Sequence, residues 1–436
     1  DETAALAAAE AMAERWPEDA RIRNLLGGIA FSMGRDQQAR ESFLAARAIA
    51  PDDPATLVNL ARLDTREGDF DAARERYLTV LERDPDAVGV MVALARLEAR
   101  AENRTAVVEW LEKARQADAT AALPRLLLAQ EYLMRREYEA ARAVASEAVS
   151  VDDGNAEAHN LLGLARQGLG DNEAAAASFG RAADLESGET GYRLNEARAQ
   201  MLLGDAQRAE ESIRAAGGED LDNVPAAAML AMAKARQGDT ESALRIARDL
   251  QERHPDNGLP HALEGELLAD QEDYAAAAAA YDEALALRQD DRRLALRAFR
   301  LRTLGNLASP EEPLLGYLSR RPLDTEIRLL VAQQSRAAGD NTVAIRQYEQ
   351  VVDAEPENFV ALNNLAWEYF EQGDSRAQEV ARRAHALAPD NDAVADTLGW
   401  ILVNTGNLEE GIVMLRQAVD LGGGRPQIRY HLAAAL

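Results

Sequence analysis

The chain has 436 residues, with 75 Asp and Glu against 48 Lys and Arg, and its formal net charge is −27. This balance argues against nucleic-acid binding, because contacts to phosphates need a basic surface. There is no cysteine, which excludes disulfides, zinc ribbons and thiol catalysis, and no apolar run reaches the roughly 18 residues of a membrane-spanning helix.

Residues 1–19 carry the pattern of a helix that ends at Pro17, because proline cannot continue a helix. Residues 20–53 then hold two apolar helical stripes, separated by a turn at Gly34 and closed by Pro51. The sequence therefore predicts a helical hairpin in residues 20–53, preceded by the second helix of a truncated hairpin in residues 1–19.

The hairpin pattern recurs about every 34 residues. Position 15 of the unit is usually glycine, position 20 is small and position 24 is bulky, as at Gly68, Ala73 and Tyr77. Position 16 is usually Asp or Asn, which cap helices, and a small residue at position 20 lets two helices approach closely. Twelve complete units are expected in residues 20–425, starting at residues 20, 54, 88, 122, 156, 190, 224, 258, 291, 325, 359 and 392.

Two parts of the chain depart from this pattern. Residues 291–324 lack the small residue at position 20, and Ser309-Pro310-Glu311-Glu312 has the spacing of a capping box that starts the second helix late. Residues 426–436 hold only the first helix of a truncated thirteenth unit. We expect a local irregularity in residues 291–324, and we interpret the two half-units as ends of a fragment of a longer protein.

A helix-turn-helix unit of this length, with these small, bulky and proline positions, resembles the tetratricopeptide repeat (TPR) over nearly the whole chain. The resemblance implies an all-α fold, a right-handed superhelical solenoid of stacked helix-turn-helix units. It also implies that unit positions 2, 5, 9, 12 and 13 of the first helices point into a concave face, where a protein partner binds.

No part of the sequence indicates an enzyme. The five histidines are scattered, and none keeps triad or metal-ligand spacing with a serine, an aspartate or a second histidine. Glycine motifs that hold phosphates are also missing. We therefore predict no catalytic residue, no metal site and no cofactor.

The groove positions of the family map onto three zones of this sequence. For Trp367 and Trp400, packing between helices is an equally good explanation. The predicted partner-binding residues are Arg62, Arg66, Arg96 and Arg100 in units two and three, Leu126, Leu133 and Met134, beside Leu123, in unit four, and Asn363, Trp367, Phe370, Trp400 and Tyr430 near the C-terminal end.

The four arginines form two pairs that share unit positions 9 and 13, so stacking should bring them side by side. Like charges repel, and guanidinium groups bind carboxylates through two hydrogen bonds. We therefore expect the partner to be an acidic protein segment or a uronic-acid polysaccharide. The alternative is that each arginine pairs with a neighbouring acid such as Asp64 or Glu98.

The C-terminal stretches Leu362-Asn363-Asn364-Leu365-Ala366-Trp367 and Asp396-Thr397-Leu398-Gly399-Trp400 resemble those of the TPR lipoproteins of exosortase (PEP-CTERM) systems. This resemblance implies a non-enzymatic scaffold for protein–protein interactions in bacterial exopolysaccharide biosynthesis or export. It places the scaffold in the periplasm, with the full-length protein anchored to the outer membrane. We expect that this fragment does not insert into a membrane and that it has no nucleic-acid partner. A cytoplasmic peptide-binding adaptor and the recognition arm of a larger enzyme are the alternatives.

Overall fold

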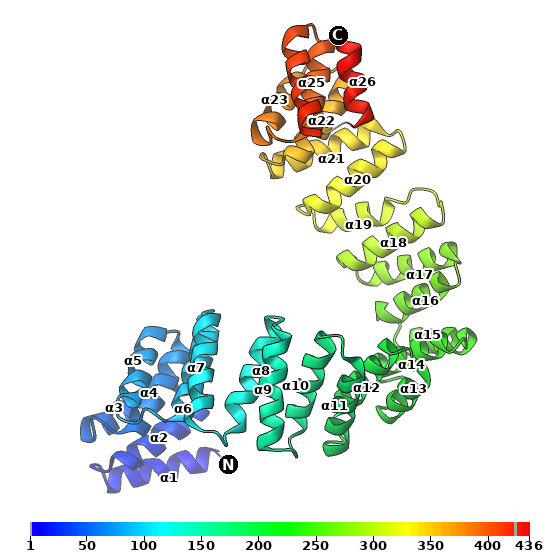
Figure 1. Ribbon diagram of the computed structural model, residues 1–436. Helices are drawn as coiled ribbons and strands as arrows, with labels where there is room; N and C mark the ends of the chain where they lie inside the picture. The colour runs from blue at the N-terminus through cyan, green and yellow to red at the C-terminus, as the bar shows by residue number, and fades with distance from the viewer. Residues whose placement is uncertain (1, 423–424) are drawn as a thin grey trace. The chain divides into compact units, whose positions relative to one another are not determined.

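The computed structural model describes residues 2–422 and 425–436, and these residues form 26 helices and no strand (Figure 1). Asp1 and residues 423–424, at the end of the twelfth expected unit, lie outside this range. The chain divides into two compact units, Asp1–Glu219 (unit A) and Asp220–Leu436 (unit B). None of the helices in the described residues combines the length and the apolarity of a membrane-spanning segment.

Unit A contains thirteen helices, which follow one another in chain order (Figure 1). They are α1 (Glu2–Arg15), α2 (Ala20–Ser32), α3 (Asp36–Ile49), α4 (Pro54–Glu67), α5 (Phe70–Leu81), α6 (Val88–Arg100), α7 (Arg104–Ala117), α8 (Ala122–Met134), α9 (Tyr138–Val151), α10 (Ala156–Gly168), α11 (Asn172–Leu185), α12 (Thr190–Leu202) and α13 (Ala206–Ala215).

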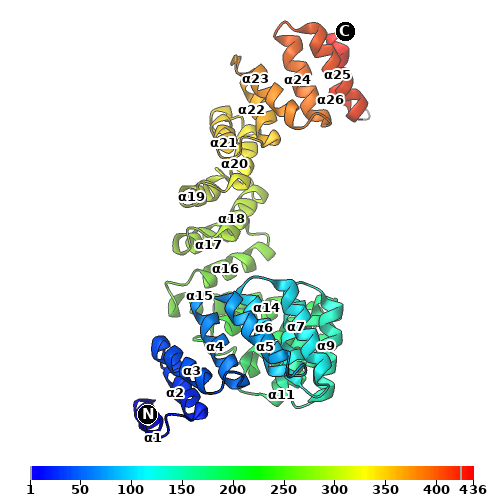
Figure 2. The ribbon, with the colours of Figure 1, turned by 90° about the vertical axis from the view of Figure 1, so that its left-hand side faces the viewer.

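Unit B also contains thirteen helices, and Figure 2 shows α16 to α20 following one another in chain order. The helices are α14 (Val224–Arg236), α15 (Thr240–Arg253), α16 (Gly258–Asp270), α17 (Tyr274–Leu287), α18 (Arg292–Leu304), α19 (Glu312–Arg320), α20 (Thr325–Ala337), α21 (Asn341–Ala354), α22 (Phe359–Glu371), α23 (Ala377–Leu387), α24 (Asp392–Asn404), α25 (Leu408–Gly422) and α26 (Pro426–Ala435).

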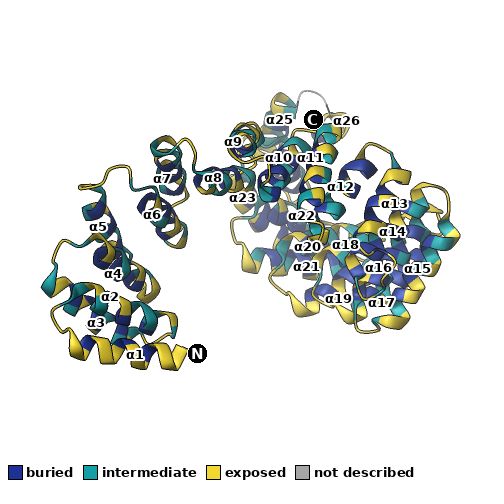
Figure 3. Ribbon diagram, turned by 90° about the horizontal axis from the view of Figure 1, so that it is seen from below, coloured by how far each residue is buried: buried dark blue, intermediate teal, exposed yellow. Residues whose placement is uncertain are grey.

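The predicted all-α solenoid of stacked helical hairpins is confirmed. First helices begin at the expected unit starts, except that α18 begins at Arg292, one residue late. Hydrophobic clusters join successive hairpins: one of them contains Val92 of α6, Leu128 of α8 and Leu161 of α10. Buried residues face neighbouring helices, whereas the end helix α1 exposes most of its surface (Figure 3).

The turns within the hairpins have left-handed backbone conformations. Most use the expected glycine, for example Gly68 with φ 88°, because glycine adopts positive φ without steric cost. Gly305 is an exception: its φ is −78°, and Asn306 takes φ 49° instead. Three units without a turn glycine place a side-chain-bearing residue in this conformation, namely Glu102, Arg136 and Glu272, with φ of 59°, 59° and 62°.

In most hairpins the Asp or Asn after the turn caps the second helix, as predicted. Asn306 and Asp374 do not, because α19 and α23 begin later in the chain. The side chains of Asp69, Asp171 and Asp239 each accept a hydrogen bond from the backbone N–H three residues ahead, at 3.1 to 3.2 Å. Such a cap contributes about 1 kcal/mol to helix stability. These repeated local signals explain why the hairpin boundaries can be read from the sequence.

A second small position, which the sequence analysis overlooked, receives the bulky residue of position 24. A Cβ added to Gly163 would come within 2.6 Å of the Phe179 ring, and one added to Gly265 within 2.6 Å of the Tyr281 ring. All twelve residues at unit position 8 are buried and are glycine or alanine: Gly27, Ala61, Ala95, Ala129, Gly163, Ala197, Ala231, Gly265, Ala298, Ala332, Ala366 and Gly399.

Residues 291–324 are irregular, as expected, but not by the expected capping box. The second helix α19 starts late, at Glu312, and its N-cap Glu311 makes no side-chain capping hydrogen bond. Ser309 has φ 49° and contributes its backbone oxygen, which accepts from the Glu312 N–H at 3.1 Å. A turn at Ser309, rather than its hydroxyl group, therefore restarts the helix.

A candidate partner-binding pocket

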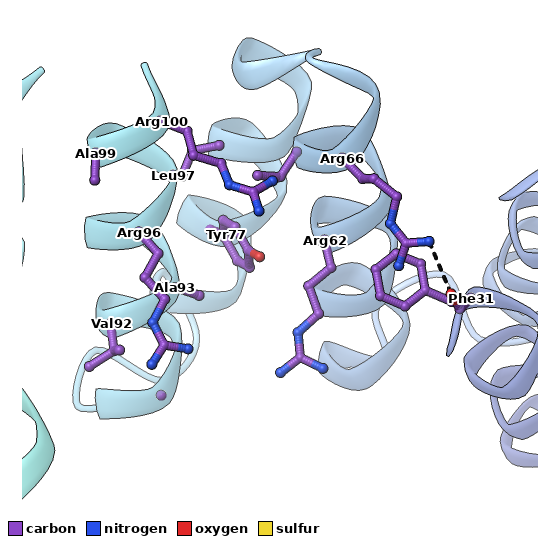
Figure 4. A pocket seen from close by; sticks show the side chains of 12 residues that line it. Phe31, Arg62, Arg66, Tyr77, Val92, Ala93, Arg96, Leu97, Ala99 and Arg100 are labelled. Carbon is purple, nitrogen blue, oxygen red and sulfur yellow. Dashed lines mark hydrogen bonds between the residues drawn. The ribbon is translucent and has the colours of Figure 1, made fainter. Parts of the chain in front are cut away.

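A hollow of about 530 Å³ lies between α4 and α6 in unit A, and we call it the arginine pocket (Figure 4). It contains all four predicted arginines. The resemblance assigned unit positions 2, 5, 9, 12 and 13 to the groove. In the third unit, all five of these positions line the arginine pocket. The lining residues are Phe31, Arg62, Thr65, Arg66, Tyr77, Gly89, Val92, Ala93, Arg96, Leu97, Ala99 and Arg100.

Arg66 is held in place at the edge of the arginine pocket. Its Nη1 donates hydrogen bonds to the Phe31 carbonyl oxygen at 3.0 Å and to Asp36 Oδ1 at 2.6 Å. Its guanidinium carbon lies 3.3 Å from the centroid of the Phe31 ring. Arg66 therefore has a counter-ion and a cation–π contact, so it forms a wall of the pocket and contributes little free charge.

The other three arginines have no acidic partner. Arg62, Arg96 and Arg100 are exposed, and none forms an ion pair or a hydrogen bond within the residues that the structure describes. Figure 4 shows the side chain of Arg62 on α4 facing those of Arg96 and Arg100 on α6. The pocket thus presents three guanidinium groups whose charge the surrounding protein does not neutralise.

The alternative pairing with Asp64 and Glu98 is not observed. Asp64 Oδ1 accepts from Arg40 at 2.8 Å and its Oδ2 from Arg76 at 2.6 Å, and Glu98 Oε1 accepts from Arg74 at 2.6 Å. Both carboxylates are 2% exposed. They point between helices, where they compensate arginines of the second helices instead of those in the pocket.

The floor of the pocket is largely apolar. Leu97 and the Tyr77 side chain are buried beneath the arginines, and Val92 and Ala93 flank them. Burial raises the pKa of the Tyr77 phenol, and the charge of Arg62 opposes this shift. Tyr77 is therefore neutral at physiological pH. Phe31 and Tyr77 were not predicted as site residues, although Phe31 occupies position 12 of the first unit, a predicted groove position.

The predicted apolar zone lies on α8, next to the pocket. Leu123 is 47% exposed and Met134 is 61% exposed. Leu126 and Leu133 are half-buried and belong to the same hydrophobic cluster as Val92 of the pocket. The arginine zone and the apolar zone therefore share one hydrophobic cluster within unit A.

The predicted C-terminal residues gather around a histidine of α26. Trp400 stacks on the His431 ring with 4.3 Å between centroids, and Trp367 lies 6.2 Å from His431 and 6.0 Å from Phe370. Tyr430 is 66% exposed. The tryptophans thus pack between successive helices, which was the structural alternative, and Tyr430 presents the most accessible ring of this group.

His431 also forms a buried pair that the sequence analysis overlooked. Its Nδ1 lies 2.9 Å from both carboxylate oxygens of Asp396, which is 35 residues away. The two residues are 5% and 7% exposed. Burial raises the pKa of Asp396, and the hydrogen bond with His431 opposes this shift only in part. The fifth predicted residue, Asn363, has a buried Oδ1 without a hydrogen-bond partner.

Within residues 2–422 and 425–436, no group of three or more His, Asp or Glu side chains could hold a metal ion. The geometry of the arginine pocket suits binding of carboxylates, since guanidinium groups donate paired hydrogen bonds to them.

Two family models, both described as tetratricopeptide repeat, match the chain. One matches residues 3–54, 126–184, 228–292 and 332–392, which is more than half of the chain, and the other matches residues 37–98. The TPR repeat-containing protein PA4667 of Pseudomonas aeruginosa is 31% identical over 99 residues, which are 22% of this chain and 17% of that protein. The matched stretch therefore spans less than a fifth of that relative.

Solved structures to which the chain is similar include yeast Tom70, with 15% identity and a TM-score of 0.33, covering 97% of this chain and 95% of that one. MamA 41-end from Desulfovibrio magneticus RS-1 is 18% identical with a TM-score of 0.34, over 37% of this chain and 92% of that one. The thermophilic TPR protein TTC0263 of Thermus thermophilus is 22% identical with a TM-score of 0.32, over 42% of this chain and 99% of that one.

Proposed function

Because the chain belongs to the tetratricopeptide repeat family, we propose that it is a non-enzymatic scaffold whose arginine pocket binds an acidic segment of a protein partner. Proteins built from this repeat bind protein partners and are generally non-catalytic. The proposal adds the place of binding and the chemistry of the ligand.

The observation that carries the proposal is the presence of three exposed, unpaired guanidinium groups in a protein of net charge −27. Acidic residues are abundant, and Asp64 and Glu98 lie on the same helices as the pocket arginines, yet both bind other arginines. Three like charges that face one hollow repel each other, and a bound carboxylate relieves this repulsion.

The test uses a fluorescein-labelled hexaglutamate peptide and the full chain, with binding followed by fluorescence anisotropy at several salt concentrations. We expect binding that weakens with salt. The double substitution Arg62→Glu and Arg96→Glu should weaken it at least tenfold and remove the salt dependence, because two charge-assisted contacts become repulsive.

The matched control is Arg198→Glu with Arg346→Glu. Both arginines are exposed, both lie outside the pocket, and the net charge changes by the same amount. This control should bind the peptide as the parent does. Equal weakening by both double variants, or no binding by the parent, would contradict the proposal. If the pocket binds polygalacturonate but not hexaglutamate, the ligand is a uronic-acid polymer and not an acidic protein segment.

We further propose that the scaffold works in the periplasm, in bacterial exopolysaccharide biosynthesis or export. The support is the resemblance of the C-terminal stretches around Trp367 and Trp400 to exosortase-associated TPR lipoproteins. Cell fractionation of the source organism with an antibody against the chain tests this part. Recovery in the cytoplasm would favour the peptide-binding adaptor, and a catalytic domain in the same full-length polypeptide would favour the recognition arm of an enzyme.

A further inference from the structure

We infer that the partner segment has two parts, an acidic cluster that enters the arginine pocket and a hydrophobic anchor that lies on the exposed face of α8. This inference rests on the proposed function and specifies the class of partner further. It comes from the surface defined by Leu123, Leu126, Leu133 and Met134, which we call the apolar patch.

The apolar patch continues the surface of the arginine pocket by one repeat. Its residues occupy unit positions 2, 5, 12 and 13 of the fourth unit, and the residues at the same positions of the third unit line the pocket. Position 13 changes from Arg100 to Met134, and position 9 changes from Arg96 to Gln130. The equivalent face of the next first helix has therefore lost both arginines and is uncharged and mainly apolar.

A shared hydrophobic cluster links the arginine pocket and the apolar patch. Val92 of α6 is buried in one hydrophobic cluster, and Leu126 and Leu133 of α8 pack against that cluster. The side chains of Leu123 and Met134 remain in contact with water, since they are 47% and 61% exposed. Together with two half-buried leucines they form an apolar area at the rim of the pocket, which is typical of a surface that binds a partner.

The patch is one repeat wide, which defines the size of the anchor. On the next first helix, α10, the residues at unit positions 2, 5 and 12 are Glu157, Asn160 and Gln167. The apolar surface therefore ends beyond α8. The anchor must be short, a few hydrophobic side chains rather than a long amphipathic helix.

The partner must reach from α6 to α8, which are successive first helices. An extended chain covers about 3.3 Å per residue, so a spacer of three residues adds about 10 Å between an acidic cluster and a hydrophobic anchor. The charge of the pocket selects an acidic segment, because a basic one would meet three unpaired guanidinium groups.

Two synthetic peptides test this inference on the full chain. The two-part probe carries three glutamates, a Gly-Ser-Gly spacer and a Leu-Phe-Leu triplet, and the acidic probe has Ser-Thr-Ser in place of the triplet. By fluorescence anisotropy, we expect the two-part probe to bind at least tenfold more tightly, because linked contacts make the second binding step intramolecular.

The double substitution Leu123→Ser and Met134→Ser should reduce binding of the two-part probe to the level of the acidic probe, without changing binding of the acidic probe. Both side chains are exposed, so the fold should be kept. Leu202→Ser with Leu203→Ser is the matched control, since these leucines are 57% and 50% exposed at the end of another first helix. The control should bind both probes as the parent does.

Equal affinity of the two probes for the parent chain, or equal losses in the test and control variants, would overturn the apolar anchor. The acidic probe would then still report on the proposed function, because its binding depends on the arginine pocket and not on the apolar patch. If the acidic probe fails to bind the parent, the proposed function and this inference both fail.

Discussion

Gly27 and Gly28 are adjacent in α2 and have different surroundings. A Cβ added to Gly27 would come within 2.5 Å of Phe43 Cδ1, whereas one added to Gly28 would meet nothing within 4 Å. Phe43 is 1% exposed and packs against Leu26 and Ala39 in one cluster. The ring therefore has no free space to occupy, and we predict that Gly27→Ala destabilises the first hairpin while Gly28→Ala stabilises it.

The two variants share one contribution and differ in another. Each removes a glycine from a helix interior, which contributes about 1 kcal/mol of stability. Only Gly27→Ala adds overpacking, which costs about 1–3 kcal/mol. The shared contribution cancels in the comparison. Since about 1.4 kcal/mol corresponds to a tenfold change in an equilibrium constant, α2 and α3 should open roughly 5 to 150 times more often in Gly27→Ala than in Gly28→Ala.

Hydrogen exchange of the full chain, followed by mass spectrometry, measures this difference because local opening exposes the amides of one hairpin. Peptides from α2 and α3 should exchange faster in Gly27→Ala, while peptides from α10 and α11 serve as an internal reference. Equal exchange in the two variants would show that position 8 does not receive the ring of position 24. Slower exchange in Gly27→Ala would refute the packing argument altogether.

Three further predictions concern single positions. Glu102→Gly should raise the free energy of unfolding by about 0.5–1 kcal/mol, because an L-residue at φ 59° is strained. Ala101→Gly is the control: Ala101 has φ −79°, so this substitution should lower the free energy of unfolding. Urea titrations measure both values, and a less stable Glu102→Gly than Ala101→Gly would contradict the argument. Burial raises the pKa of Tyr192 to about 12, so the folded state favours the neutral phenol and stability is lost as pH rises from about 10 to 12. Tyr192→Phe should reduce this loss in thermal melts, and an unchanged pH profile would refute it. His431→Ala should speed hydrogen exchange in α26, because the buried carboxylate of Asp396 loses its partner. The control Tyr430→Ala removes an exposed side chain and should leave the exchange unchanged. Equal effects of the two substitutions would disprove the role of the His431–Asp396 pair.

Much of the fold follows from local sequence patterns. A hairpin boundary depends on residues within a few positions of each other, such as Gly68 with positive φ and Asp69 as the helix cap. Because every unit needs the same turn and cap, the pattern repeats and identifies the unit starts. The shift from Gly305 to Asn306 shows the limit of this reasoning, since α18 begins one residue late and its turn moves with it.

The candidate site was predicted in part for the same reason. Equivalent unit positions lie side by side in a stack, so the periodicity alone brings Arg62 and Arg96 to one surface. The periodicity could not show that Arg66 pairs with Asp36, or that the ring of Phe31 lies beneath its guanidinium group. These contacts join neighbouring hairpins, and they depend on the directions of side chains after packing.

The charge of the pocket was decided by tertiary structure alone. The sequence shows Asp64 and Glu98 close to the pocket arginines, and it predicts equally well that they neutralise them. In the folded chain both carboxylates are buried between helices, where they bind arginines of second helices. An ion pair forms where helix packing brings two side chains into contact, so proximity in sequence does not determine it, and three guanidinium groups remain unpaired for this reason.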